Sequence, residues 1–224
     1  MIITIDGPAG VGKTTLVNNL SKRLRLTPIS SGNLYRAVTI AVIKHGIDCN
    51  NEKAIRVLLK KTNISIQDDL IVLNGVNVTN RLHTPEVDDV VPYVANHKTV
   101  RKYVNSIIRK MAKHNNVVLE GRDMGKVFSD ADVKFVLTAS VEERARRRFV
   151  ADALQRRTVD LITKNIIMRD GVVKKRGRYG KLTPVKNAIV LDTTNMTSDQ
   201  VLEVVTTRVN EKCRFGRPVV PSKR

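Results

Sequence analysis

The chain has 224 residues, a formal net charge of +19 and a hydrophobic content of 42%, of which aromatic residues supply little. This length and composition suit one α/β domain with an aliphatic core, and no apolar run approaches the roughly 20 residues of a membrane-spanning helix. Two cysteines, Cys49 and Cys213, lack ligand-like spacing, which argues against a zinc site or a disulfide framework and is compatible with a reducing compartment.

The start of the chain predicts a phosphate-binding loop. Residues 1–5 form a β-branched run typical of a buried strand, and residues 14–24 carry apolar side chains at helical spacing. Between them, residues 7–14 match G-x-x-x-x-G-K-[ST] at every fixed position. In such a loop, backbone N–H groups and Lys13 hold phosphate oxygens, and the Thr14 hydroxyl joins a Mg²⁺ shell. We predict that a nucleoside triphosphate binds to Gly7, Pro8, Ala9, Gly10, Val11, Gly12, Lys13, Thr14 and Thr15.

The next part of the chain predicts helices around a small antiparallel meander. In order, we expect a strand at 27–32, a helix at 33–44 stopped by Gly46, a helix at 52–61, and strands at 63–67, 70–73 and 76–78. Asn74-Gly75 is the strongest hairpin signal in the chain. Thr84 is the expected N-cap of a further helix with Pro85 in its first position, and a longer helix follows at 98–114.

Strands and helices then alternate again. We expect strands at 117–120, 133–137 and 188–192, a strongly basic helix over 142–169, and then a polar loop with Gly171, Gly177 and Gly180. The alternation predicts a doubly wound parallel sheet flanked by helices, with ligands at the carboxyl ends of its strands. Residues 212–224 predict a disordered basic tail.

Three further motifs narrow the interpretation. They are Ser31-Gly32-Asn33-Leu34-Tyr35-Arg36, Glu120-Gly121-Arg122-Asp123-Met124-Gly125 and Glu142-Glu143-Arg144-Ala145-Arg146-Arg147-Arg148. Together with the phosphate loop they resemble the cytidylate kinases of the bacterial type, from residue 2 to about residue 207. The resemblance implies a P-loop fold with a five-stranded parallel sheet, a small inserted monophosphate-binding subdomain and a helical lid. It implies one kinase domain over 1–211, with a core at 1–50, 93–140 and 186–211, an insertion at 51–92, a lid at 142–182 and a tail at 212–224.

The activity that the resemblance implies is transfer of the ATP γ-phosphoryl group to CMP or dCMP, with Mg²⁺, by a monomer. By position, Ser31 and Arg36 resemble contacts to the acceptor nucleotide, Arg36 to its phosphate, and Arg122 resembles a second phosphate ligand. Arg101 and Asp123 resemble the pair that reads the cytosine edge. The exocyclic amine of cytosine suits a carboxylate, whereas uracil would face Asp123 with a carbonyl oxygen.

The lid supplies the last expected site residues. Arg169 and Arg176, in the loop expected after the basic helix, match the closing arginines of the family's lid. Phosphoryl transfer needs positioning and cationic stabilisation more than covalent chemistry, and guanidinium groups suit that task. We therefore expect Lys13, Arg122, Arg169 and Arg176 to be catalytic.

The sequence also departs from the family's pattern. Ser30 and Glu120 stand where the family has aspartates, and Lys126 replaces a threonine. Val173 replaces a carboxylate expected to hold the acceptor ribose, and Pro92 replaces a serine that helps to read the base. The residues expected to bind the phosphates are all present, whereas some of those expected to recognise the base and the ribose are replaced. A relaxed-specificity pyrimidine monophosphate kinase therefore stays open as the alternative.

The basic excess leaves other readings open. Positive charge attracts nucleic acid, speeds the arrival of anionic substrates, or covers a solvated surface. Nucleic acid is an open partner that is not favoured, because no aromatic residues interleave the charge. For the arginines of residues 144–148, ATP contact and a solvated helix face stay equally open, and a degenerate nucleotide-binding scaffold is a third reading. We expect the first strand to start at residue 2 and to leave no room for a signal peptide, and we therefore expect a cytoplasmic protein without a membrane partner.

Overall fold

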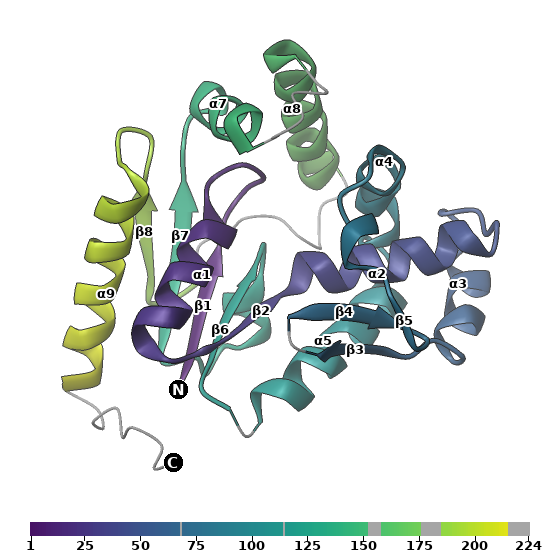
Figure 1. Ribbon diagram of the computed structural model, residues 1–224, viewed down its shortest axis with the longest axis horizontal. Coiled ribbons are helices and arrows are strands. Elements are labelled where there is room, and N and C mark those ends of the chain that lie inside the picture. The colour runs from purple at the N-terminus through teal and green to yellow at the C-terminus, as the bar shows by residue number, and fades with distance from the viewer. Residues whose placement is uncertain (68, 114, 152–157, 176–184, 215–224) are drawn as a thin grey trace. The chain divides into compact units, whose positions relative to one another are not determined.

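The computed structural model describes residues 1–67, 69–113, 115–151, 158–175 and 185–214 (Figure 1). The chain forms two compact units. The first unit consists of Met1–Pro28, Asn115–Ile167 and Leu182–Arg224. The second unit consists of Ile29–His114 and Met168–Lys181. The finer division into core, insertion and lid stays a prediction.

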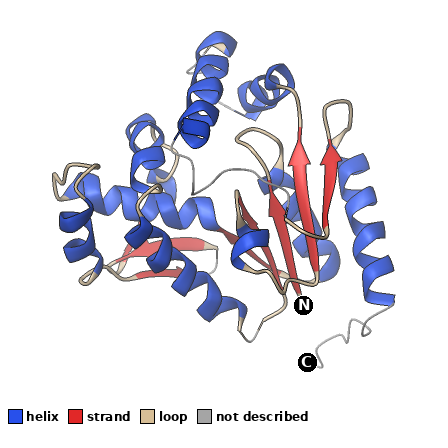
Figure 2. Ribbon diagram, turned by 180° about the vertical axis from the view of Figure 1, so that it is seen from behind, coloured by secondary structure: helices blue, strands red, loops and turns tan. Residues whose placement is uncertain are grey.

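The first unit is built around a five-stranded sheet with the order β2-β6-β1-β7-β8. Figure 2 shows strands in red and the helices beside them in blue. The central strand β1 pairs in parallel with β6 on one side and with β7 on the other, and β7 pairs in parallel with β8. These pairings confirm the predicted doubly wound parallel sheet. The strands are β1 (Ile2–Asp6), β2 (Thr27–Ser30), β6 (Val117–Gly121), β7 (Val133–Thr138) and β8 (Ala188–Asp192).

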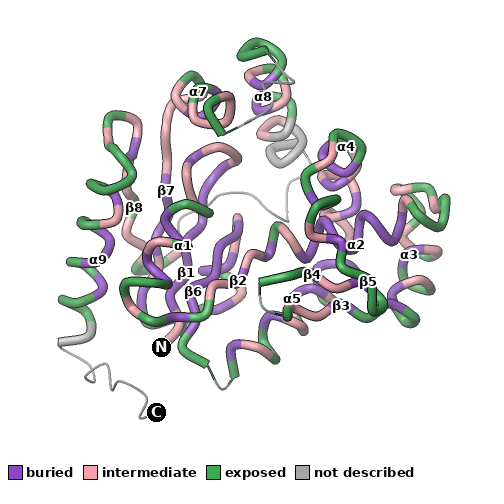
Figure 3. Tube along the Cα trace, viewed as in Figure 1, coloured by how far each residue is buried: buried purple, intermediate pink, exposed green. Residues whose placement is uncertain are grey.

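Two helices, α1 (Lys13–Leu24) and α9 (Ser198–Arg214), share one aliphatic core with this sheet. Their apolar side chains recur every three or four residues, so each helix presents one stripe to the strands. The central strands are buried along most of their length (Figure 3). The buried members of the core include Ile3, Ile5, Leu16, Val17, Leu20, Phe135, Val201, Val205 and Val209.

The expected single basic helix over 142–169 is wrong. Two helices stand there, α7 (Val141–Ala151) and α8 (Val159–Lys175), and residues 152–157 lie outside the described part of the chain. Gly171 lies inside α8, not in a loop, because one glycine costs a helix only about 1 kcal/mol relative to alanine. Of the other two loop glycines, Gly177 and Gly180, neither lies among the described residues.

Among its described residues, the second unit carries the helices α2 to α5, the C-terminal part of α8, a 3₁₀ turn and an antiparallel sheet with the order β3-β4-β5. The meander is confirmed, and its two-residue turn has both central residues at positive φ, 49° at Asn74 and 82° at Gly75. The elements are α2 (Ser31–Lys44), α3 (Glu52–Leu59), β3 (Ile64–Gln67), β4 (Leu70–Leu73), β5 (Val76–Asn77), the 3₁₀ turn Thr79–Arg81, α4 (Pro85–Val94) and α5 (Lys98–Ala112).

Several ends of elements differ from the sequence-based expectation. Helix α2 begins at Ser31, two residues early, because the Ser30 hydroxyl accepts a hydrogen bond from the N–H of Asn33 and caps the helix. Thr84 is the N-cap residue of α4, but its hydroxyl donates to the carbonyl of Arg81 and does not cap the helix.

The C-terminal segment also departs from expectation. Helix α9 continues to Arg214, so residues 212–214 are helical and not part of a disordered tail, and residues 215–224 lie outside the described part. Among the described helices, none combines the length and the apolar character that crossing a bilayer requires.

Candidate active site

The phosphate-binding loop occupies residues 7–14, between the carboxyl end of β1 and the start of α1 (Figure 1). Gly10 and Gly12 have φ values of +81° and +96°, which side chains rarely adopt, and Gly12 is the N-cap residue of α1. The Lys13 ammonium donates to the carbonyl oxygens of Gly7, at 2.9 Å, and of Pro8, at 2.8 Å. The first turn of α1 therefore presents backbone N–H groups and one cation to an anion.

Neighbouring backbone approaches two glycines of the loop closely. A Cβ atom on Gly7 would lie 2.9 Å from the carbonyl oxygen of Leu137, at the end of β7. A Cβ atom on Gly10 would lie 2.7 Å from the carbonyl oxygen of Arg144, in α7. Both distances are too short for a real side chain, so the loop fits against β7 and α7 only as glycine.

Two arginines of α7 hold the loop by its carbonyl groups. Arg144 is buried and donates from Nη1 to the carbonyl oxygen of Ala9 at 3.1 Å. Arg147 donates from Nη1 to the carbonyl oxygen of Val11 at 3.1 Å and to the hydroxyl of Thr193 at 3.0 Å. Sequence reasoning left these residues open between ATP contact and a solvated face. They contact the loop itself.

Glu143 ties two arginines of α7 together. Its carboxylate accepts from Arg146 and from Arg147 at 2.8 Å, and the hydrogen bond from Arg146 is the main cause that lowers the pKa of Glu143 to about 2. The side chain of Arg146 is 66% exposed, so this arginine points to solvent.

A hydroxyl and a carboxylate meet beside the loop. Thr14 Oγ1 donates to Glu120 at 3.0 Å from Oε2 and 3.2 Å from Oε1. Glu120 is 6% exposed at the carboxyl end of β6, whereas Thr14 is exposed. Hard oxygen donors of this kind are the ones Mg²⁺ prefers. The described residues contain no group of three or more His, Cys, Asp or Glu side chains that could hold a metal by themselves.

Asp6 links the loop to the segment after β6, and sequence reasoning missed it. Its carboxylate, 4% exposed, accepts from the backbone N–H groups of Met124 at 2.8 Å and Gly125 at 2.7 Å. Burial raises the pKa of Asp6 to about 6, although these two hydrogen bonds oppose the shift. The signal in the sequence that could have identified Asp6 is a carboxylate directly after the apolar run of β1. Its partners lie more than a hundred residues away.

Arg122 and Asp123 stand at the carboxyl end of β6, next to the loop. Their neighbour Gly121 is the register partner of Asp6, and the N–H of Gly7 donates to its carbonyl oxygen at 3.2 Å. Asp123 is the N-cap residue of helix α6 (Met124–Val127), but its side chain makes no capping hydrogen bond. The fold thus brings both predicted residues beside the predicted phosphate site.

The predicted acceptor residues of the second unit lie on helices α2 and α5. Ser31 is the first residue of α2 and is buried. Arg36 is 7% exposed, and Arg101 is 8% exposed and stacks its guanidinium over the ring of Tyr35, with Cζ 5.5 Å from the ring centroid. Arg101 also donates to the carbonyl oxygen of Ala95 at 3.3 Å. Three buried polar side chains on packed helices are unusual outside a binding site or an ion-pair network.

Only some of the residues predicted for the lid lie in the described part of the chain. Arg169 lies in α8, not in the loop where it was expected, and nothing of its side chain is described. The same holds for Val173, and Arg176 lies outside the described residues. Pro92 lies inside α4.

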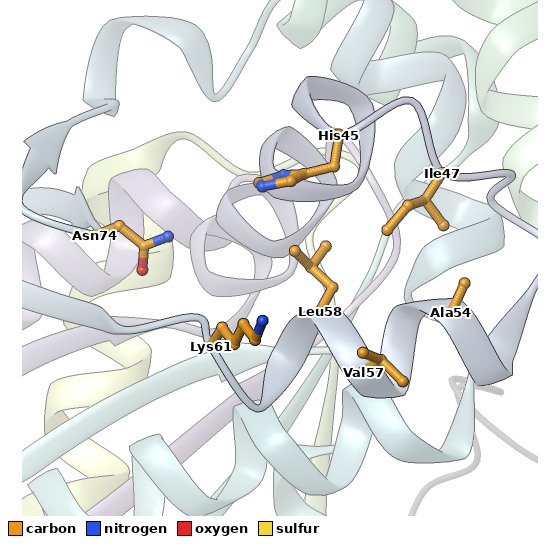
Figure 4. Close-up of a pocket in the computed structure, with 7 residues that line it drawn as sticks. All are labelled: His45, Ile47, Ala54, Val57, Leu58, Lys61 and Asn74. Atoms are coloured by element: carbon orange, nitrogen blue, oxygen red, sulfur yellow. The ribbon is translucent and has the colours of Figure 1, made fainter.

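A cavity of about 520 Å³ lies in the second unit (Figure 4). None of the predicted site residues contributes to it, and its lining is mostly apolar, so it does not carry the phosphate chemistry. The lining residues are His45, Ile47, Ala54, Val57, Leu58, Lys61 and Asn74.

Comparisons with known proteins find one family along nearly the whole chain. The sequence profile described as cytidylate kinase matches residues 3–211. The cytidylate kinase of Clostridioides difficile (strain 630) is 37% identical over 213 residues, which are 94% of this chain and 98% of that protein. The cytidylate kinase of Shouchella clausii (strain KSM-K16) is 37% identical over 219 residues, 95% of this chain and 97% of that protein.

Solved structures support the fold alone. A gluconokinase from Sinorhizobium meliloti 1021 aligns with a TM-score of 0.50 and 12% identity over 96% of this chain and 97% of that chain.

Proposed function

This chain belongs to the cytidylate kinase family, and we propose that it transfers the γ-phosphoryl group of ATP to CMP or dCMP, giving ADP and CDP or dCDP. The observation that carries the proposal is the complete phosphate loop at residues 7–14, whose glycines, Lys13 and Thr14 stand beside Arg122 and Asp123. The family favours this enzyme over a polynucleotide-binding protein built on the same loop.

The loop binds the donor nucleotide in this proposal. Backbone N–H groups around Gly10 and Gly12 cradle the phosphates of ATP, and the ammonium of Lys13 exchanges its carbonyl partners for β- and γ-phosphate oxygens. Arg144 and Arg147 keep the loop in shape by binding its carbonyl groups, so the N–H groups stay turned toward the ligand.

The residues present fit a magnesium ion that arrives with ATP. Thr14 supplies a hydroxyl and Glu120 a carboxylate within hydrogen-bond distance of each other, and phosphate oxygens and water complete such a shell. When bound, the ion neutralises charge on the transferring phosphoryl group. Glu120 orients the Thr14 hydroxyl. Its side chain is one methylene longer than that of the aspartate at this position in the family's pattern.

In this proposal the acceptor nucleotide is bound by the residues that the resemblance to the family assigns to it. Ser31 and Arg36 bind the monophosphate end together with Arg122, and Arg101 and Asp123 read the cytosine edge. Loss of the Asp123 hydrogen bond to the amine, with a buried acceptor left unpaired, would cost UMP about 1–3 kcal/mol. Arg169 and Arg176 close over the phosphates and exclude water, which would otherwise turn transfer into hydrolysis.

A relaxed preference among pyrimidines is the second candidate, and Pro92 favours it. The residue lies inside α4, has no side-chain hydrogen-bonding group and occupies the position of a base-reading serine in the family's pattern. Val173 likewise has no side chain that accepts a hydrogen bond from a ribose hydroxyl. Both changes weaken recognition of the base and sugar without touching the phosphates.

One screen tests the proposal: the eight common ribo- and deoxyribonucleoside monophosphates as acceptors, with ATP and Mg²⁺, in a coupled assay for ADP. We expect CMP and dCMP to react best. Comparable turnover with UMP would establish the relaxed enzyme, and no acceptor-dependent ADP with any of the eight would refute the kinase. We propose that the protein is a monomer. We also propose that it is cytoplasmic, because both nucleotides are supplied in the cytoplasm.

A further inference from the structure

We propose that Asp88 is a positioning residue that fixes the guanidinium of Arg36 for the phosphate of the acceptor nucleotide. The inference rests on the proposed function and concerns a residue in none of the four motifs. All of its geometry lies within the second unit.

The two side chains form a buried ion pair between α2 and α4. Arg36 Nη2 lies 2.7 Å from Asp88 Oδ1, and the two side chains are 8% and 3% exposed. Arg36 Nη1 also donates to the carbonyl oxygen of Leu82 at 2.9 Å. The guanidinium is therefore held at two of its nitrogens, by a helix on one side and by the turn before that helix on the other.

Such a frame suits a phosphate ligand. A free arginine has several rotatable bonds, and ordering them at the moment of binding weakens the affinity for the ligand. A guanidinium presents five N–H donors in one plane; one of them donates to Leu82, and Asp88 lies against Nη2 as the counter-ion, which leaves donors for phosphate oxygens. The guanidinium of Arg36 is thus oriented before the nucleotide binds.

Charge balance points the same way. A buried arginine without a counter-ion is expensive to desolvate, and Asp88 supplies that counter-ion when no nucleotide is bound. A nucleoside monophosphate carries close to two negative charges near neutral pH, so its phosphate is attracted to the guanidinium beside the single carboxylate. Asp88 balances the charge of Arg36 and orients it, and the phosphate binds to the other side of the same guanidinium.

A merely structural ion pair would behave differently in kinetics. Breaking it would lower the stability of the enzyme. The KM values for CMP and ATP would then either change little or change by the same factor. A positioning residue for the acceptor changes KM for CMP alone. The ratio of the two KM values therefore separates the alternatives.

The test compares Asp88→Asn and Asp88→Glu with Asp89→Asn in the full-length enzyme. Asp89 is the next residue of the same helix, is exposed, and loses the same charge in its variant. We expect Asp88→Asn to raise KM for CMP about tenfold, equivalent to roughly 1.4 kcal/mol of binding free energy. KM for ATP should stay within about twofold of wild type, and Asp89→Asn should match wild type in both.

Asp88→Glu keeps the charge and displaces it by one methylene, so it should fold and raise KM for CMP by a smaller factor. If Asp88→Asn does not fold, Asp88→Glu decides alone. An unchanged ratio of KM values in every folded variant overturns the proposal, and so does failure of both variants to fold, since Asp88 is then needed for stability alone. A wild type without CMP kinase activity would instead refute the proposed function.

Discussion

Arg144 reaches from α7 to the phosphate loop and donates to the carbonyl oxygen of Ala9, 135 residues earlier in the chain, at 3.1 Å. Its own carbonyl oxygen lies where a side chain on Gly10 would have to stand. One residue therefore sets both the shape of the loop and the identity of its middle glycine. The motif at residues 7–14 supplies the loop, and α7 holds it in place.

Arg144→Ala should weaken the loop and the fold together. Losing a buried charged donor and leaving the Ala9 carbonyl without it should lower the free energy of unfolding by about 2–3 kcal/mol. KM for ATP should rise about tenfold or more. Urea denaturation and steady-state kinetics measure both effects. Arg146→Ala, in the same helix but 66% exposed, should change stability by less than about 1 kcal/mol. Equal effects in the two variants would contradict the loop-holding role.

Gly10→Ala should damage the enzyme more than Gly75→Ala, although the two glycines have nearly the same φ, +81° and +82°. Each alanine pays about 1–2 kcal/mol for the left-handed backbone. At Gly75 nothing lies within 4 Å of the added atom, whereas at Gly10 it meets the Arg144 carbonyl at 2.7 Å. We expect a further loss of about 1–3 kcal/mol and weak ATP binding for Gly10→Ala only. Calorimetric ATP titration and denaturation of both variants check this.

The stability that Asp6 contributes should depend on pH. Its folded pKa is about 6, above the ordinary value of 3.8, so the folded state holds the proton more tightly than the unfolded chain. The contribution is fully present below pH 3.8 and is lost as the pH rises through about 6. Over that window the unfolding free energy of wild type relative to Asp6→Asn should fall by about 2–4 kcal/mol. Denaturation at several pH values between 4 and 7.5 measures it, and a difference that grows with pH would contradict the buried carboxyl.

Lys13→Ala should lose phosphoryl transfer without unfolding. The ammonium donates to the carbonyl oxygens of Gly7 and Pro8, and the side chain is not a member of the aliphatic core, so its removal leaves that core intact. We expect kcat to fall by at least about 100-fold, as for other removed electrostatic groups. Lys22→Ala, an exposed lysine of the same helix, is the control and should match wild type. If Lys13→Ala keeps normal turnover, the loop does not bind the transferred phosphate.

Glu120→Gln should raise the Mg²⁺ concentration needed for half-maximal activity by about tenfold, because the carboxylate beside Thr14 becomes a neutral amide. Glu120→Asp, which introduces the residue of the family's pattern, should stay close to wild type. Mg²⁺ titration at fixed ATP measures both, and Glu211→Gln, exposed on α9, is the control. Identical Mg²⁺ curves for all three would remove Glu120 from the metal site.

The elements that sequence reasoning predicted well are those with local signals. The phosphate loop, the parallel strands and the Asn74-Gly75 turn depend on residues that are neighbours in the chain. The prediction of a loop at Gly171 was wrong because a glycine is only a statistical signal for the end of a helix. The other residues of α8 favour the helix more strongly.

The residues that were missed, Asp6 and Asp88, and Arg147, whose role was left open, act across the chain. Asp6 meets backbone groups 118 and 119 residues later, and Arg147 meets Val11 136 residues earlier. Asp88 pairs with an arginine on another helix. No periodicity or motif marks such pairs, because they exist only after the elements have packed.

Ser30 shows how a departure from the family's pattern can leave the architecture intact. Its hydroxyl caps α2, so the helix begins at Ser31, as it would with a carboxylate cap, and Arg36 follows in its second turn. The serine does so without adding a negative charge to the first turns of α2, where Asp88 already balances Arg36. In the proposed function Arg36 binds the phosphate of the acceptor, so a second acid there would repel the incoming dianion, and the neutral cap avoids that repulsion.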